Sequence, residues 1–304
     1  MDLSILIVNW NTRNLLAQCL QSLYANPPDG EFEVWVVDNA STDGSVQMVR
    51  EQFPQVRLIE NSENAGFAWA NNQAIRRSSG RHLLLLNPDT EIWPGAPETL
   101  VRFMEEYPQA GAAGARLLNP DGTLQESCHP FPTLGREVWR LFHLDALWPR
   151  ARYEMTRWDL ETPRPVDAVQ GACVMLRREA LEQVGLLDED YFMYTEEVDL
   201  CYRLRRGGWR IYWAPQATVV HYGGQSTQQM PAEMFLRLYE SKLFYFRKHH
   251  GRQAARAYKL ILLAAAVARL LLSPLAWLER PPQRQRHLAL AGYYRRLVWA
   301  LREM

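Results

Sequence analysis

Short apolar runs alternate with helical patterns through the first 115 residues, and this alternation limits the fold more than any other feature. The expected strands are residues 4–9, 33–38, 56–60, 82–87 and 110–116, and the expected helices are residues 14–25, 45–53, 67–79 and 97–107. Strands that alternate with helices of this length form a sheet that is covered by helices on both faces. The sequence therefore predicts a three-layer α/β domain.

Two of the predicted strands are followed or ended by an aspartate. Asp89 lies just past the leucine run 83–86, and Asp38 ends the run 33–38 before a loop of short polar residues and Gly. Open α/β sheets bind ligands beyond the carboxyl ends of their strands, and carboxylate oxygens suit Mg²⁺ or Mn²⁺. Either aspartate alone is compatible with an ordinary turn. Together they suggest a nucleotide and a metal at one edge of the sheet.

Three carboxylates, Glu196, Glu197 and Asp199, lie within four positions after an aromatic segment. Aromatic rings beside clustered acids are typical of a cleft that binds a sugar and removes a proton from it. A carboxylate beside a second carboxylate and apolar rings has its charged form disfavoured, which suits a general base. The alternative is the acidic first turn of a helix over residues 196–206, where the helix dipole favours anions. Taken alone, this segment leaves both interpretations open.

Four blocks of the sequence, taken in order, resemble the family 2 glycosyltransferases with the GT-A fold, and among them the bacterial rhamnosyltransferase-like branch. The blocks contain SILIVNWN with VVDNASTDGS, NAGF, LNPD, and residues 171–206 followed by HYGGQS. They cover roughly residues 3–227. The resemblance implies a Rossmann-like, mostly parallel sheet flanked by helices. It also implies inverting transfer of a sugar from a nucleoside-diphosphate sugar, dTDP- or UDP-linked, with dTDP-rhamnose as the first guess.

The resemblance further implies roles for single residues. Asp38 would accept a hydrogen bond from the pyrimidine of the donor. Asp89, at the last position of the family's Asp-x-Asp motif, would hold Mg²⁺ or Mn²⁺ together with His221, the family's late metal-binding histidine. Asn87 stands where the fuller motif has its first carboxylate. The expected donor-binding residues besides Asp38 are Asn9, Asn64, Gly66 and Asn87.

The catalytic base implied by the resemblance is Glu197, at a position that more often holds Asp. The neighbouring Glu196 is the second candidate, and Asp199 is expected to be structural. The implied chemistry is direct displacement at the anomeric carbon, in which one carboxylate deprotonates the acceptor hydroxyl. The implied product belongs to cell-envelope glycan synthesis, with a lipid-linked or polysaccharide acceptor.

Composition and domain organisation agree with an intracellular enzyme. With 304 residues, 47% of them hydrophobic, the chain is long enough for one catalytic domain and an appendage. We expect a GT-A domain over 1–227, with a nucleotide-sugar half (1–116) and an acceptor half (117–227), and a helical region over 228–304. Residues 128–165 are expected to be a variable excursion near the acceptor side. Four scattered cysteines and a strand that follows Met1 almost directly indicate a reducing compartment and no signal peptide.

The last 54 residues carry a strong positive charge. They contain ten Lys or Arg and two acids, Glu279 and Glu303, so the tail carries about +8 and residues 1–250 about −8. The run 260–278 is almost wholly apolar, but Arg269 and Pro274 interrupt it and argue against a membrane span. We expect basic helices that lie on the inner face of the cell membrane. The alternative is a helical pair that packs on the domain or forms a dimer, and no nucleic-acid module accompanies the basic tail.

Two other functions fit part of the pattern. A sugar nucleotidyltransferase also uses βαβ sheets, but its first strand is usually followed by a glycine-rich phosphate loop, whereas residues 9–14 contain no glycine. A non-catalytic, membrane-associated nucleotide-sugar-binding protein would not need Asp89, Glu197 and His221. The sequence therefore favours a metal-dependent, inverting glycosyltransferase.

Overall fold

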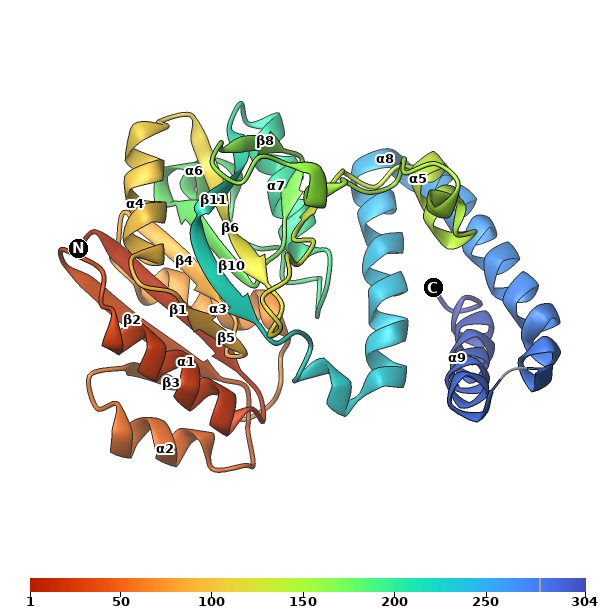
Figure 1. Ribbon diagram of the computed structural model, residues 1–304, viewed down its shortest axis with the longest axis horizontal. Coiled ribbons are helices and arrows are strands. Elements are labelled where there is room, and N and C mark those ends of the chain that lie inside the picture. The colour runs from red at the N-terminus through yellow and green to blue at the C-terminus, as the bar shows by residue number, and fades with distance from the viewer. Residues whose placement is uncertain (279) are drawn as a thin grey trace. The chain divides into compact units, whose positions relative to one another are not determined.

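The computed structural model describes residues 1–278 and 280–304; Glu279, one of the two acids counted in the tail, lies outside them. The chain divides into two compact units. The first comprises Met1–Phe131, Tyr153–Phe192 and Glu196–Gln229, and the second comprises Pro132–Arg152, Met193–Thr195 and Met230–Met304. The segment Pro132–Arg152, part of the excursion that the sequence placed in the acceptor half, thus groups with the helical second unit (Figure 1).

The first unit is built on a nine-stranded sheet in the order β3-β2-β1-β4-β10-β6-β11-β5, with β8 paired to β11. Its strands are β1 (Leu3–Asn9), β2 (Phe32–Asp38), β3 (Arg57–Glu60), β4 (His82–Leu86), β5 (Thr90–Ile92), β6 (Ala110–Leu118), β8 (Arg164–Val166), β10 (Cys173–Arg177) and β11 (Arg210–His221). Two short strands, β7 (Cys128–His129) and β9 (Ala168–Val169), form a separate antiparallel pair.

Helices cover both faces of this sheet. They are α1 (Arg13–Ala25), α2 (Ser45–Gln52), α3 (Phe67–Arg77), α4 (Ala96–Glu106), α6 (Arg178–Val184) and α7 (Glu196–Arg206). Because side chains alternate across a strand, β1 contributes Ile5 and Ile7 to the core beneath α1, α2 and α4, and Leu6 to the core beneath α3, α6 and α7. Each of these fully buried side chains contributes roughly 1.5–3 kcal/mol to stability. The predicted α/β fold class is confirmed.

The sheet is parallel across β3, β2, β1 and β4, and becomes mixed beyond β4. Strand β10 runs antiparallel to both of its neighbours, β4 and β6. The backbone N–H of Asn87 donates to the Ala172 carbonyl at 2.9 Å. This bond places the start of β10 beside the end of β4. A strand that starts there and pairs with β4 must be antiparallel to it. The apolar pattern of residues 173–177 predicts a buried strand but carries no information on this direction.

The second unit is helical. It contains α5 (Leu134–Leu141), α8 (Pro231–Leu272), α9 (Pro281–Ala300) and the 3₁₀ turns Leu144–Ala146 and Ser273–Leu278. Helix α8 is kinked at Gly251, whose φ of 85° is a conformation that glycine adopts without a Cβ clash. The predicted interruption of the apolar run is confirmed, because the α-helix ends at Leu272 and Pro274 lies in the following 3₁₀ turn.

One face of α8 packs into a core of its own within this unit, where Phe246, Tyr258 and Leu262 meet Tyr294 and Leu297 of α9. A buried ion pair adds to this core: Lys242 Nζ lies 3.1 Å from Glu137 Oε1 of α5. Across residues 1–278 and 280–304, no helix has the length and apolar character needed to cross a membrane.

Candidate active site

The carboxyl ends of β1 and β2 hold two candidate donor-binding residues side by side. Asn9 and Asp38 are paired in register, and Asn9 Nδ2 donates to Asp38 Oδ1 at 2.9 Å. The other Asp38 oxygen accepts the backbone N–H of Ser41 at 2.8 Å. Asn9 also donates to Ser41 Oγ and accepts from Thr12 Oγ1, so both N–H groups of its amide are engaged within the protein. Asn9 therefore holds Asp38 in place, and direct contact of Asn9 with a nucleotide stays a prediction.

The loop before α3 contains the next two candidates, Asn64 and Gly66. Asn64 Oδ1 accepts the Gly66 N–H at 3.1 Å and the Asn39 side-chain amide at 3.2 Å, which ties this loop to the end of β2. Gly66 has φ 93°, and a Cβ at this position would overlap the backbone of Phe192. Phe67 N donates to the Phe192 carbonyl at 2.8 Å. The glycine is thus needed for α3 to begin against the segment that leads to the acid cluster.

The end of β4 and the end of β11 bring Asp89 and His221 together. His221 Nε2 lies 3.3 Å from Asp89 Oδ1 and 3.4 Å from Asn87 Nδ2. On the other side of the ring, Nδ1 lies 2.7 Å from Gln125 Oε1, a side-chain oxygen that can only accept. His221 therefore carries its proton on Nδ1 when neutral, which leaves the Nε2 lone pair directed toward Asp89.

These two side chains fit a divalent cation. Ligands at right angles around Mg²⁺, each roughly 2.0–2.1 Å from the ion, lie about 3 Å apart, close to the 3.3 Å that separates Asp89 Oδ1 and His221 Nε2. Within the described part of the chain, no group of three or more His, Cys, Asp and Glu side chains could hold a metal. A cation here would therefore take its remaining ligands from water and from a bound diphosphate, as Mg²⁺ usually does.

Helix α7 begins at the acid cluster and gives its three carboxylates different surroundings. Asp199 is fully buried and forms an ion pair with Arg203, whose Nε lies 2.7 Å from its carboxylate, in agreement with the expected structural role. Glu196 is also buried, and burial together with the charge of Glu197 raises its pKa well above the ordinary value. Glu197 is only partly buried. Of the two catalytic candidates, Glu197 is the more accessible, whereas Glu196 retains its proton to higher pH than an ordinary glutamate.

The turn before β10 connects the carboxylates at the start of α7 to the Asp89–His221 pair. A Cβ on Gly171 would lie 3.9 Å from the Glu197 Cβ and 3.7 Å from the Phe67 ring, so this turn runs beside both. The next residue, Ala172, accepts the Asn87 N–H at the end of β4. The start of α7 and the end of β4 are therefore held at the same turn, although the sequence separates them by more than 100 residues.

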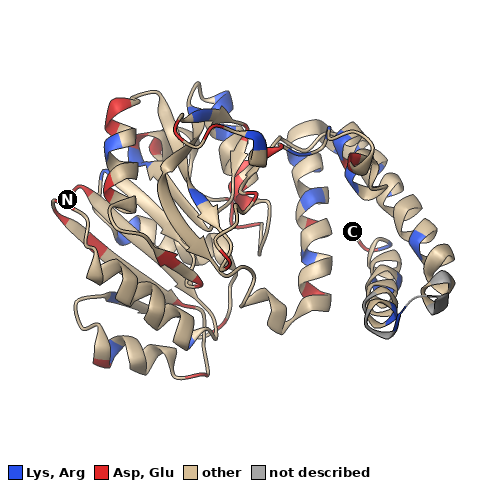
Figure 2. Cartoon of the chain, in the orientation of Figure 1, with Lys and Arg blue, Asp and Glu red and all other residues tan. Residues whose placement is uncertain are grey.

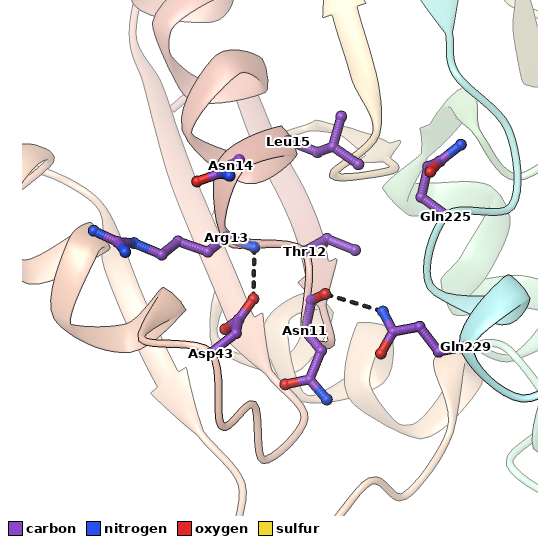
Figure 3. Close-up of a pocket in the computed structure, with 8 residues that line it drawn as sticks. All are labelled: Asn11, Thr12, Arg13, Asn14, Leu15, Asp43, Gln225 and Gln229. Carbon is purple, nitrogen blue, oxygen red and sulfur yellow. Dashed lines mark hydrogen bonds between the residues drawn. The ribbon is translucent and has the colours of Figure 1, made fainter.

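A pocket of about 470 Å³ opens at the start of α1. Figure 3 shows Gln225 and Gln229 facing the segment Asn11–Leu15 across it. The lining residues are Asn11, Thr12, Arg13, Asn14, Leu15, Asp43, Gln225 and Gln229. Gln225 also donates its backbone N–H to Asp89 Oδ2 at 3.3 Å, which places the pocket next to the Asp89–His221 pair. The amino end of α1 borders this pocket, where the Arg13 N–H donates to Asp43 Oδ2 at 2.8 Å, and the Arg13 side chain extends away from Gln225 and Gln229 (Figure 3).

The sequence analysis did not identify Gln125, Arg13 or Gln225. The sequence does carry a signal for Gln125: residues 119–122 read Asn-Pro-Asp-Gly, which favours a tight hairpin, and Leu118 and Leu124 form an antiparallel bridge across it. A tight hairpin after β6 returns the chain beside the end of β11, where His221 lies, because β6 pairs with β11. Arg13 carries no local motif, and Gln225 lies in the HYGGQS block but was given no role there.

Comparison with known proteins shows which protein family this chain resembles. Residues 4–185 match the family model for glycosyl transferase family 2. The N-acetylglucosaminyl-diphospho-decaprenol L-rhamnosyltransferase of Mycobacterium tuberculosis is 33% identical over 233 residues, which cover 72% of this chain and 75% of that protein.

Two solved structures are similar in fold. A mannosyltransferase from Pyrobaculum calidifontis, in complex with GDP-Man and Mn²⁺, superposes with a TM-score of 0.57 at 19% identity and covers 96% of this chain and 84% of its own. GalNAc-T7 with UDP, GalNAc and Mn²⁺ gives a TM-score of 0.57 at 16% identity and covers 73% of this chain and 44% of its own. The expected GT-A fold is confirmed.

Proposed function

The chain belongs to glycosyl transferase family 2, and from that premise we propose that it transfers rhamnose from dTDP-rhamnose to a lipid-linked acceptor in cell-envelope glycan synthesis. The name of the mycobacterial relative supports both the sugar and a polyprenyl-diphosphate acceptor. Because such an acceptor lies in a membrane, the proposal includes peripheral attachment at the inner membrane face. The observation that carries it is the Asp89–His221 pair, 3.3 Å apart, beside a pocket with an arginine at its helix start.

Donor binding follows from the residues at the carboxyl edge of the sheet. Asp38 keeps unused acceptor capacity after its bonds from Asn9 and Ser41, since a carboxylate has about four lone-pair sites. We assign it to the pyrimidine N–H. Arg13 and the amino end of α1 line the pocket beside Asp43, and their positive charge would favour the donor diphosphate.

The metal ligands of this proposal are Asp89 and His221, and Gln125 orients the histidine. A bound Mg²⁺ or Mn²⁺ supplies positive charge that offsets the charge on the departing nucleoside diphosphate. The Mn²⁺ in the two similar structures supports this cofactor class.

Glu197 is the proposed general base. It accepts the proton of the acceptor hydroxyl while that oxygen forms its bond to the anomeric carbon, and the bond to the diphosphate oxygen breaks on the opposite side. The configuration at the anomeric carbon is therefore inverted, and no covalent enzyme intermediate is formed. Glu196 is buried and its pKa is raised, whereas Glu197 is only partly buried, which supports Glu197 as the base.

A donor screen tests the proposal. Purified protein is incubated with dTDP-rhamnose, a UDP-sugar or GDP-mannose and a polyprenyl-diphospho-N-acetylglucosamine acceptor, with Mn²⁺ or with EDTA, and released nucleoside diphosphate is measured. We expect acceptor-dependent release from dTDP-rhamnose with Mn²⁺. Release from none of the donors would contradict the proposal. Pyrophosphate release from a nucleoside triphosphate and a sugar phosphate would indicate the nucleotidyltransferase alternative instead.

A further inference from the structure

The second half of α8 exposes a stripe of apolar side chains. Leu260 is 66% exposed, Leu263 36%, Val267 41% and Leu271 75%. Their spacing of three or four residues places them on one face over three turns of the helix. Single exposed apolar residues are common on protein surfaces, but four that follow one another along one helix face form a contiguous patch. We call these four residues the α8 stripe.

The only charged residue of the run 260–278 points away from the α8 stripe. Arg269 follows Leu260 by about two and a half helical turns and therefore lies on the opposite side. Its Nη2 lies 2.9 Å from His143 Nε2, and its guanidinium lies over the Tyr294 ring at 4.9 Å from the centroid. Arg269, whose charge argues against a membrane span, is thus held against the helical unit by His143 and Tyr294. The α8 stripe itself carries no charge.

Cations lie at the beginning of the α8 stripe. Arg256 is one turn before Leu260 on the same face, Arg252 is a further turn away, and both are exposed. Figure 2 shows further Lys and Arg positions on α8 and α9. An apolar helix face next to the exposed Arg252 and Arg256 matches the chemistry of an anionic bilayer surface.

We propose that the α8 stripe is a membrane-docking face that lies flat in the headgroup region of an anionic phospholipid bilayer, with Arg252 and Arg256 on lipid phosphates. The proposal rests on the proposed use of a lipid-linked acceptor, for which it supplies the surface of contact. Deletion of residues 252–304 is not a suitable test of this proposal. That deletion would take Tyr258 and Leu262 out of the helical core and so disturb folding.

The test uses the full chain and vesicles of phosphatidylcholine with or without phosphatidylglycerol, in the absence of any nucleotide sugar. L260E/L271E changes the two most exposed residues of the α8 stripe without touching the core. We expect the partition constant for phosphatidylglycerol vesicles to fall at least about tenfold. The control L147E changes an 85% exposed leucine outside α8 and is expected to bind as wild type. R252Q/R256Q is expected to bind more weakly at low salt but like wild type at high salt.

Equal sedimentation of L260E/L271E and wild type would overturn the proposal, as would the absence of vesicle binding by wild type. A wild-type dimer in light scattering that L260E/L271E converts to a monomer, without vesicle binding, would show that a second copy covers the stripe. Thermal unfolding confirms that the variants fold. Turnover with a short-chain, water-soluble acceptor separates the two proposals: if it persists while vesicle binding is absent, the docking face is wrong and the transferase function stands.

Discussion

Replacing Gln125 by leucine should weaken the metal site without touching either proposed ligand. Gln125 Oε1 lies 2.7 Å from His221 Nδ1 and fixes the proton there, so that Nε2 faces Asp89. Leucine is similar in size but cannot accept a hydrogen bond. In the variant, the ring is free to rotate and to carry its proton on Nε2, the nitrogen that must be free to bind a cation.

The expected loss is about 10- to 100-fold in Mn²⁺ affinity, the usual effect of removing the partner that orients a ligating histidine. Tenfold corresponds to about 1.4 kcal/mol, which is also the upper range for one neutral hydrogen bond of this kind. A loss of Mn²⁺ affinity beyond tenfold would reflect the lost orientation of the His221 ring. Electron paramagnetic resonance of free Mn²⁺, titrated with protein in the presence of dTDP, gives the affinity directly, and turnover gives a parallel activation constant.

Two control variants sharpen this experiment. Q125E keeps an acceptor for Nδ1 and is expected to retain most of the affinity. N119A removes one of the two acceptors of the Gln125 amide nitrogen, 2.9 Å away, and the Asn119 bond to Thr123, but leaves the bond from Gln125 to the His221 carbonyl; it is expected to bind Mn²⁺ nearly as wild type. Wild-type Mn²⁺ affinity in Q125L would refute the assignment of Gln125, and an equal loss in N119A would point to loop disruption rather than to the histidine proton.

Three further outcomes follow from the same site and its scaffold. Glu197→Gln should lower turnover about 10²-fold or more with little change in donor affinity, and Glu196→Gln should be milder; the reverse order would exchange their roles. Asp89→Ala should abolish metal-dependent turnover and weaken donor binding while thermal unfolding remains cooperative, and near-normal turnover would remove Asp89 from the metal site. Burial alone would raise the pKa of Glu33, but hydrogen bonds from Ser79 and Ser4 and the Arg57 charge lower it overall. The stability from Glu33, about 1–3 kcal/mol, is therefore present above about pH 4 and lost in stronger acid, so the gap in unfolding free energy between wild type and E33Q should shrink there.

Local pattern was sufficient for most elements of the first unit. Predicted and observed bounds agree to within two residues for the five strands and four helices assigned up to residue 116, and α7 has the predicted limits Glu196–Arg206. These elements are set by which residues are apolar at a spacing of two or 3.6, and burial on the two faces of the sheet agrees with that spacing. The family resemblance also indicates both Asp89 and His221, whose side chains lie 3.3 Å apart.

Contacts between distant segments could not be predicted from the local sequence pattern. Gln125 and His221 are 96 positions apart, and no spacing rule connects them. The antiparallel direction of β10 follows from where the chain enters the sheet, not from its apolar residues. Arg269 interrupts the apolar run in the sequence. In the structure it leaves the apolar face of α8 uncharged, because its side chain contacts His143 and Tyr294 on the other side of the helix. In each case, the deciding information is a tertiary contact.

The most direct test of the central proposal is transfer of rhamnose to polyprenyl-diphospho-N-acetylglucosamine by wild-type protein, first in EDTA and then after Mn²⁺ is restored. The product is quantified by mass spectrometry, and its anomeric configuration is read by NMR. We predict little or no product in EDTA, full recovery with Mn²⁺, and a configuration opposite to that of the donor. Unchanged transfer in EDTA would contradict the Asp89–His221 metal site. A product with the donor's configuration would contradict single displacement with Glu197 as the base.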